Sequence, residues 1–393
     1  IDQNTFLLEP VSAENLVNNR NSRNFWCNVK GIGSWSLTGN AAEALSKKFT
    51  EMQDDSEVTA GFMWQKTTRE SKKYQLRGEI LSFIPVEKNV EVMLVTITNT
   101  GRMAQTVTPT VAIPLYGRSA DNIRDHRHVT SLLHRIETTD TGVLVTPTLS
   151  FDERGHQVNH MTYYCVGWSG NGEKPVDFYP TAEDFVGEGG NFERPYAIVK
   201  NAEGVKAGTR IEGLEAVGGL HFSEVTLGPE EECSYLIFTG ITEDIQEIRN
   251  LSKTYTTREM VLEELEKTKA YWQEKVNVAY HTGDSDFNQF MHWVSFQPIL
   301  RRIYGCSFLP HHDYGKGGRG WRDLWQDCLA LLIMNPDGVR QMLLDNFAGV
   351  RVDGSNATII GSKQGEFVAD RNHITRVWMD HGVWPMITTK FYI

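Results

Sequence analysis

The residue pattern of the chain changes near Thr242, and this change is the strongest constraint on its fold. Before it, Val107, Val111 and Ile113 alternate with small or polar residues, which is the pattern of a strand with one face in a core. Residues 90–97 have apolar residues at both odd and even positions, so both faces of the strand are apolar, as expected of an inner strand. Many short segments of this kind, separated by Gly, Asn or Pro, predict a large antiparallel sandwich.

After Thr242 the pattern becomes helical. Residues 245–277 contain no Gly or Pro and are rich in Glu, Lys, Leu and Met. Asp284 or Ser285 can cap a second helix. Its buried stripe is predicted to consist of Phe287, Phe290, Met291 and Val294. Further helices are predicted to begin near residues 321, 339 and 378.

A chain of 393 residues is too long for one ordinary core. We therefore predict a β-sandwich domain over 1–242, a helical linker over 243–305 and a second helical domain over 306–393. The chain does not begin with Met, and residues 390–393 show no helix-ending signal. We expect it to be a piece of a longer polypeptide.

Composition limits the class of partner. The 39 basic and 50 acidic residues give a formal charge of −11, which argues against a nucleic acid or an anionic membrane and is compatible with a neutral substrate. Five widely spaced cysteines, an odd number without a Cys-x-x-Cys pair, predict reduced thiols in the cytoplasm. Neither a membrane-spanning apolar run nor a signal peptide is visible in the sequence.

Residues 311–327 form the candidate binding loop. Its four glycines allow the backbone to approach a ligand closely, and Lys316, Arg319 and Arg322 supply cationic donors. A helix that starts near Trp321 would direct its backbone N–H groups to the same place. These features predict a site for a polar, hydroxyl-rich or anionic small molecule.

Two carboxylates follow this loop. Asp323 and Asp327 are four residues apart and would share one face of the helix. Carboxylates fixed by a neighbouring arginine are suitable acceptors for sugar hydroxyls. The alternative is an acidic residue that stabilises the helix N-terminus and a surface arginine that pairs with it. The density of Trp, His and Gly between residues 311 and 327 favours the binding site.

Two other groups of residues have simpler explanations. His126 and His128 stand in an arginine-rich polar segment, Arg124-Asp-His-Arg-His128, so we expect solvated histidines and not a metal site. Trp26, Trp35 and Trp64 could stack on sugar rings, but tryptophans of a sandwich more commonly pack in its core. We therefore assign no metal and no stacking platform.

Four motifs occur in the order found in one known family. They are Ala270-Tyr-Trp272, Arg322-Asp-x-x-Gln-Asp327, Asp353-Gly-Ser355 and Trp378-x-Asp380-x-x-x-Trp384. Through them the chain resembles glycoside hydrolase family 94, the inverting β-glycoside phosphorylases. The resemblance implies an N-terminal antiparallel β-sandwich, a helical linker, an (α/α)6 barrel and a C-terminal sheet domain. Only the first two and the opening helices of the barrel would lie in this chain.

The resemblance also implies a reaction. Segments 308–315 and 367–373 are most similar to 1,2-β-oligoglucan phosphorylases. Such an enzyme removes one glucosyl unit from a β-glucan by attack of inorganic phosphate and releases α-glucose 1-phosphate without a further cofactor. The family's general acid lies in a Trp-Asn-Asp motif that is absent from residues 1–393. We therefore expect the acid beyond Ile393, in the remainder of the polypeptide.

Site residues follow from the matched motifs. Arg322 and Asp323 would hold hydroxyls of the glucosyl unit, and Asp327 would either bind sugar or orient Arg322. Asp380 matches a family residue near the sugar, although a helix cap explains it equally well. Either Lys316 or Arg319 would bind phosphate.

Several alternatives remain open at this point. An inverting hydrolase on the same barrel would need a second carboxylate as the base. A non-catalytic carbohydrate-binding domain would need only the sandwich. A homodimer is expected by analogy alone.

Overall fold

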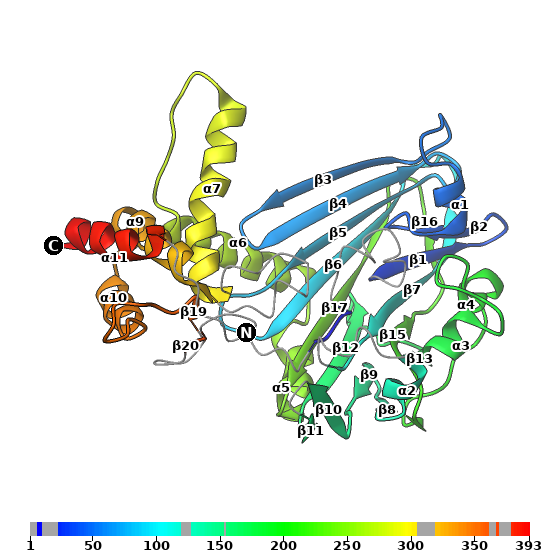
Figure 1. The fold of residues 1–393 in the computed structure, drawn as a ribbon. Helices are drawn as coiled ribbons and strands as arrows, with labels where there is room; N and C mark the ends of the chain where they lie inside the picture. Colours follow the sequence, from blue (N-terminus) through cyan, green and yellow to red (C-terminus); the bar gives the residue numbers. More distant parts are fainter. Residues whose placement is uncertain are drawn as a thin grey trace. The chain divides into compact units, whose positions relative to one another are not determined.

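A computed structural model describes residues 6–9, 23–118, 127–152, 155–304, 319–360, 367–368 and 379–393 (Figure 1). The described chain divides into two compact units, and the boundary between them falls within helix α6 (Arg258–Lys275), after Lys269. None of the described helices is both long and apolar enough to cross a membrane. The predicted boundaries at residues 242 and 305 stay predictions.

The first unit contains a nine-stranded antiparallel sheet in its described part (Figure 1). From edge to edge its strands are β14 (Arg210–Glu212), β8 (Arg135–Thr138), β9 (Gly142–Val145), β12 (Thr162–Ser169), β17 (Glu232–Thr242), β6 (Val90–Asn99), β5 (Leu76–Phe83), β4 (Trp64–Ser71) and β3 (Asp55–Gly61). The pairing of β17 with β6 brings Glu232 opposite Thr98, and β17, the last described strand of this unit, lies in the middle of the sheet.

A second antiparallel sheet, with six strands among the described residues, completes the sandwich. Its strands are β13 (Asp177–Thr181), β15 (Ala216–His221), β7 (Gln105–Leu115), β1 (Asn24–Val29) and β2 (Gly33–Ser36), with β16 (Val225–Leu227) paired to β7. A separate hairpin consists of β10 (Leu149–Asp152) and β11 (Gly155–Val158).

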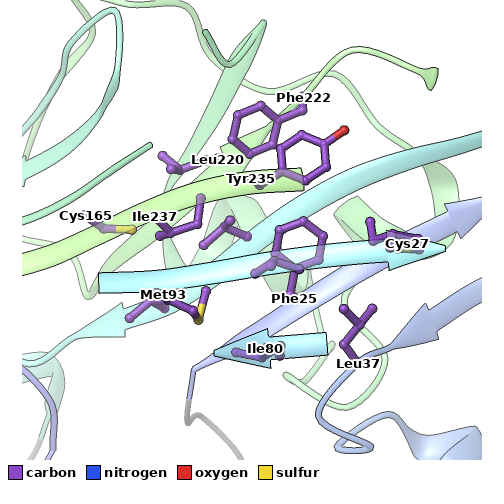
Figure 2. Packing of buried hydrophobic residues seen from close by; sticks show 14 of the residues in the cluster. Phe25, Cys27, Leu37, Ile80, Met93, Cys165, Leu220, Phe222, Tyr235 and Ile237 are labelled. Carbon is purple, nitrogen blue, oxygen red and sulfur yellow. The ribbon is translucent and has the colours of Figure 1, made fainter. Parts of the chain in front are cut away.

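The main hydrophobic core lies between the two sheets. Residues Met93, Val95 and Ile97 of β6 face this core together with Val107, Val111 and Ile113 of β7. Figure 2 shows the ring of Tyr235 grouped with those of Phe25 and Phe222, whose centroids lie 5.5 and 4.7 Å from it. The alternation read from residues 107–115 therefore identified the core face correctly.

Parts of the outer faces of both sheets are buried as well. Val92 and Leu94 of β6 point away from the central core and pack with residues of α5 (Ile245–Thr254) and α6. On the other sheet, Trp26 and Tyr179 pack beneath α3 (Ala182–Val186) and α4 (Tyr196–Lys200). Two short helices complete this unit, α1 (Ala42–Ser46) and α2 (Arg127–Ser131). Burial on both faces explains why β6 has apolar residues at both odd and even positions.

The two sheets lie close together at a glycine. A Cβ on Gly218 of β15 would lie 2.3 Å from the Cβ of Cys165 on β12, so no larger residue fits there without a shift.

The helical segment predicted over 245–277 is interrupted. It forms α5 and α6, and Tyr255 between them leaves the helical conformation. The Tyr255 carbonyl accepts a hydrogen bond from Trp168 Nε1 at 2.9 Å, and its ring stacks on Phe238. The break between the two helices coincides with this contact to the sheet, in a segment without Gly or Pro.

The second unit is helical. It contains α7 (Ser285–Tyr304), α9 (Trp321–Met334), α10 (Val339–Phe347) and α11 (Met379–Tyr392), with a small sheet of β18 (Arg319–Gly320), β19 (Ile359–Ile360) and β20 (Phe367–Val368). Asp284 caps α7 by accepting from the backbone N–H of Asp286 and Phe287, as predicted.

The predicted buried stripe of α7 is wrong. Phe287, Phe290 and Val294 are exposed by 46, 62 and 37%, and Met291 is only partly buried. The buried residues lie in the second half of the helix, where Phe296 and Ile299 are covered. The periodicity correctly indicated a helix with an apolar face. Within the described residues, however, only the second half of that face is packed against other side chains.

We predict that His134 makes the sandwich sensitive to acid. Its Nδ1 donates to Leu214 O at 3.1 Å, and burial, reinforced by the nearby Arg118 charge, lowers its pKa to about 4. Between pH 6.5 and 4 the unfolded chain binds this proton more readily, so the free energy of unfolding falls as pH falls, by about 3 kcal/mol.

Urea unfolding at pH 7 and at pH 4 measures this change. His134→Gln keeps a donor but does not titrate, so its stability should decrease less than that of the wild type. An equal decrease in both proteins would refute the assignment to His134.

Candidate functional site

The start of α9 is fixed by strand pairing. Gly320 has extended backbone angles and belongs to β18, which pairs with β19. The backbone N–H of Trp321 donates to Thr358 O at 2.9 Å. The helix begins at Trp321, as predicted, so Arg322 and Asp323 occupy its first turn.

Three of the predicted site residues meet at this helix start. Arg322 Nη1 lies 3.4 Å from Asp380 Oδ2, and Arg322 Nε lies 3.9 Å from Asp323 Oδ1. All three side chains are between 37 and 47% exposed. Ion pairs with this exposure contribute little to stability, and their donors and acceptors stay accessible to a ligand.

The position of Asp380 depends on contacts between α9 and α11. Trp321 Nε1 donates to His381 O at 3.1 Å, and Thr388 Oγ1 donates to Trp325 O at 2.9 Å. Both tryptophans are fully buried. Two hydrogen bonds, one near each end of the contact, therefore place the first turn of α11 beside the first turn of α9.

Asp327 has a different environment. Its side chain is 3% exposed, and its Oδ1 lies 2.7 Å from Arg301 Nη2 on α7. Burial raises its pKa to about 7, although the Arg301 charge lowers it, and Asp323 adds to the increase. The structure thus pairs Asp327 with Arg301, whereas Arg322 has Asp380 and Asp323 as its neighbours.

Arg301 was not identified from the sequence. The available signal was indirect: Asp327 falls on the apolar side of α9, and a buried carboxylate requires a cation or a proton. The basic pair Arg301-Arg302 in the last turn of the preceding helix was the nearest source of that cation.

The phosphate-binding candidates are only partly visible. Lys316 lies outside the described residues, as does the side chain of Arg319, whose backbone forms β18.

Asp353, in the third of the four motifs, caps an exposed turn. Its Oδ1 accepts hydrogen bonds from Ser355 N and Oγ at 2.9 and 2.7 Å. The segment 124–126 also lies outside the described residues.

Trp26, Trp35 and Trp64 of the sandwich all pack against its hydrophobic clusters, as expected, and two of them are fully covered. Trp26 and Trp35 are buried. Trp64 is partly exposed, and Lys269 Nζ lies 4.7 Å above its ring.

An apolar cavity of about 680 Å³ lies between α9, α10 and α11. Its lining includes Trp321, Phe347, Val350, Pro385 and Met386, but neither Arg322 nor Asp380. Because this lining offers few partners for sugar hydroxyls, the site candidate remains the Arg322 cluster, that is, Arg322, Asp323 and Asp380.

A known family model matches most of the sandwich sequence. Residues 15–258 match the family model described as glycosyl hydrolase 94, supersandwich domain. The chain belongs to glycosyl hydrolase family 94. The resemblance inferred from the four motifs is therefore confirmed at the level of the family, and the helices after residue 258 extend beyond the matched part.

Relatives of this family 94 chain were found by sequence and by structure. A cyclic β-(1,2)-glucan synthase, NdvB of Rhizobium meliloti strain 1021, is 26% identical over 203 residues, which are 48% of this chain and 6% of that protein. The structure of a bacterial glucoamylase complexed with acarbose is similar to this chain with a TM-score of 0.53 and 11% sequence identity. The similarity covers 93% of this chain and 49% of the glucoamylase chain. The chain thus spans a small part of the first relative and about half of the second.

The fold class expected of a family 94 chain is confirmed. An antiparallel sandwich comes first, helices link it to the next part, and α9 to α11 are opening helices of an (α/α)6 barrel. The structural likeness to the glucoamylase supports the fold alone.

We predict that Asp327 gives the helical unit the opposite pH dependence to that of His134. The native state holds a proton that the unfolded chain has released at pH values above the ordinary pKa of 3.8. The free energy of unfolding therefore falls as pH rises from 4 through 7, by at most about 4 kcal/mol.

Asp327→Asn should remove most of this slope. Denaturant unfolding followed by circular dichroism at several pH values provides the measurement. An unchanged slope in the variant would mean that Asp327 is ionised throughout this range.

Proposed function

We propose that the polypeptide that carries this chain catalyses inverting phosphorolysis of β-glucans, with β-1,2-glucooligosaccharides as substrates and α-D-glucose 1-phosphate as product. The observation that carries this proposal is the Arg322 guanidinium between the carboxylates of Asp323 and Asp380. Membership in family 94 supports the same class of chemistry.

The cluster suits the glucosyl unit at the point of cleavage. A sugar hydroxyl can donate to a carboxylate oxygen and accept from a guanidinium N–H at the same time. Asp323 and Asp380 approach Arg322 from two different helices, so hydroxyls on neighbouring ring carbons could each find a partner. A charged pair held by packed helices loses little entropy on binding.

The proposed reaction requires one carboxylic acid. A phosphate oxygen forms a bond to the anomeric carbon while the glycosidic carbon–oxygen bond breaks, and a general acid protonates the leaving oxygen. Phosphate replaces the activated water of a hydrolase, so no second carboxylate is needed as base. We place the acid outside residues 1–393, and we assign phosphate binding to Lys316 or Arg319.

The β-1,2 linkage is the finer part of the proposal. The printed name of the sequence relative, a cyclic β-(1,2)-glucan synthase, supports it. The motif segments 308–315 and 367–373 point to the same linkage. We also propose a cytoplasmic location, which agrees with the free thiols of the four cysteines in the described part of the chain.

The decisive test uses the full-length polypeptide that contains these residues. It is incubated with β-1,2-glucooligosaccharides, with and without inorganic phosphate, and glucose 1-phosphate is assayed. Phosphate-dependent release supports the proposal. Phosphate-independent release of free glucose would instead establish an inverting hydrolase, and inactivity on β-1,2-, β-1,3- and β-1,4-glucans would favour a binding domain.

We predict that Arg322→Ala lowers kcat/KM for the oligosaccharide on the order of 100-fold, because it removes charge-assisted hydrogen bonds to the reacting sugar. Arg322→Lys should recover only part of the activity, since an ammonium lacks the planar pair of donors. Steady-state kinetics with saturating phosphate measures both effects.

The matched control is Arg340→Ala, which removes an exposed arginine from α10 in the same unit. Its activity should stay close to that of the wild type. Equal losses in the two variants would show that Arg322 has no specific role.

A further inference from the structure

The contact between α7 and α9 includes a buried ion pair whose two partners differ in exposure. Asp327 on α9 is almost fully buried, whereas Arg301 on α7 is one-third exposed. Arg301 Nη2 contacts Asp327 Oδ1, and within the described residues neither Asp327 Oδ2 nor Arg301 Nε has a hydrogen-bond partner. The charge of Asp327 therefore depends on one contact with Arg301.

This contact lies one helical turn beyond Asp323. The separation of four residues places Asp323 and Asp327 on the same face of α9, and the two carboxylates affect each other electrostatically. If Arg301 were absent, an ionised Asp327 would repel the Asp323 carboxylate one helical turn earlier on α9. The pairing of Asp327 with Arg301 therefore affects the surroundings of Asp323 in the Arg322 cluster.

The opposite side of α9 is held by α11. The hydrogen bonds of Trp321 and Trp325 to α11 fix the helix there, and the Arg301–Asp327 pair fixes it to α7. The first turn of α9 carries Arg322 and Asp323, so its orientation depends on both sets of contacts. Of these contacts, only the one to α7 involves two opposite charges.

We propose that Arg301 is a positioning residue of the sugar site, which acts through Asp327 to hold Arg322 and Asp323 in the geometry that binds the glucosyl unit. The inference rests on the proposed function of this site. Arg301 does not contact the Arg322 cluster directly, so its effect must pass through the α7–α9 contact. Loss of one partner from such a pair is costly because the other charge remains buried.

The test uses Arg301→Met in the full-length polypeptide, assayed at about pH 8, where Asp327 of the wild type is ionised and where the variant lacks the Arg301 charge that lowers the pKa of Asp327. We expect KM for the oligosaccharide to rise by roughly tenfold or more, while KM for phosphate changes less than about twofold. Arg301→Lys retains a cation and should recover part of the affinity. These measurements are made well below the unfolding temperature of each variant.

Arg302→Met is the matched control. Arg302 is the next residue on α7, and its Nη1 donates to Asp337 O at 3.2 Å and not to Asp327. We expect both KM values of this variant to match those of the wild type. The double variant Arg301→Met/Asp327→Leu removes both charges, so it should bind the oligosaccharide better than Arg301→Met alone.

The outcomes separate the positioning role from a structural role. If Arg301→Met lowers only the unfolding temperature and leaves KM for the oligosaccharide unchanged, the inference is overturned. It is also overturned if both KM values rise equally, or if Arg302→Met has the same effect. Should Arg301→Met fail to fold, Arg301→Lys and the double variant decide by the same criterion.

Failure of the proposed function gives a different result. If the wild type releases no glucose 1-phosphate, calorimetric titration with the β-1,2-linked glucose disaccharide replaces the kinetic assay. Weaker binding to Arg301→Met than to the wild type, by roughly tenfold, still supports the positioning role. Equal binding, or no binding to the wild type, overturns it.

Discussion

Burial of both faces of the central strands is the constraint on which the sandwich depends. An inner strand such as β6 has one apolar face toward the other sheet and a second toward α5 and α6. The helices are therefore needed to shield from water the outer apolar face that the opposite sheet does not cover. The six-stranded sheet has the same arrangement, with Trp26 and Tyr179 beneath α3 and α4. The sheets and the helices that cover them thus depend on each other.

In the helical unit, α9 connects two environments. Its first turn presents Arg322 and Asp323 in a half-exposed position, where charged groups can exchange water for a ligand. One turn later Asp327 is buried and needs Arg301. The same helix therefore supplies an accessible polar cluster and a buried ionic contact, and the buried side chains of Trp321 and Trp325 fix it between its neighbours. This arrangement is suitable for a binding site because the ligand meets groups that are already fixed.

Sequence patterns predicted the elements better than their surroundings. The alternation in β7 was confirmed because it depends on residues close in sequence, and the start of α9 at Trp321 was confirmed as well. The buried stripe of α7 was wrong, since an apolar helix face shows that a partner is needed but not where that partner lies. The interruption at Tyr255 was missed because its cause, the indole of Trp168, is far away in the sequence.

The sequence by itself determined the order of sandwich and helices, the family through its four motifs, and the candidates Arg322, Asp323 and Asp380. The order follows from periodicity and composition, and the family and its site candidates follow from the resemblance of short motifs. Only the tertiary structure decided that Arg322 lies beside Asp380, 58 positions away, and that Asp327 pairs with Arg301 instead of Arg322. Charges choose partners by distance in space and by the water that burial removes, and neither quantity is encoded in spacing along the chain.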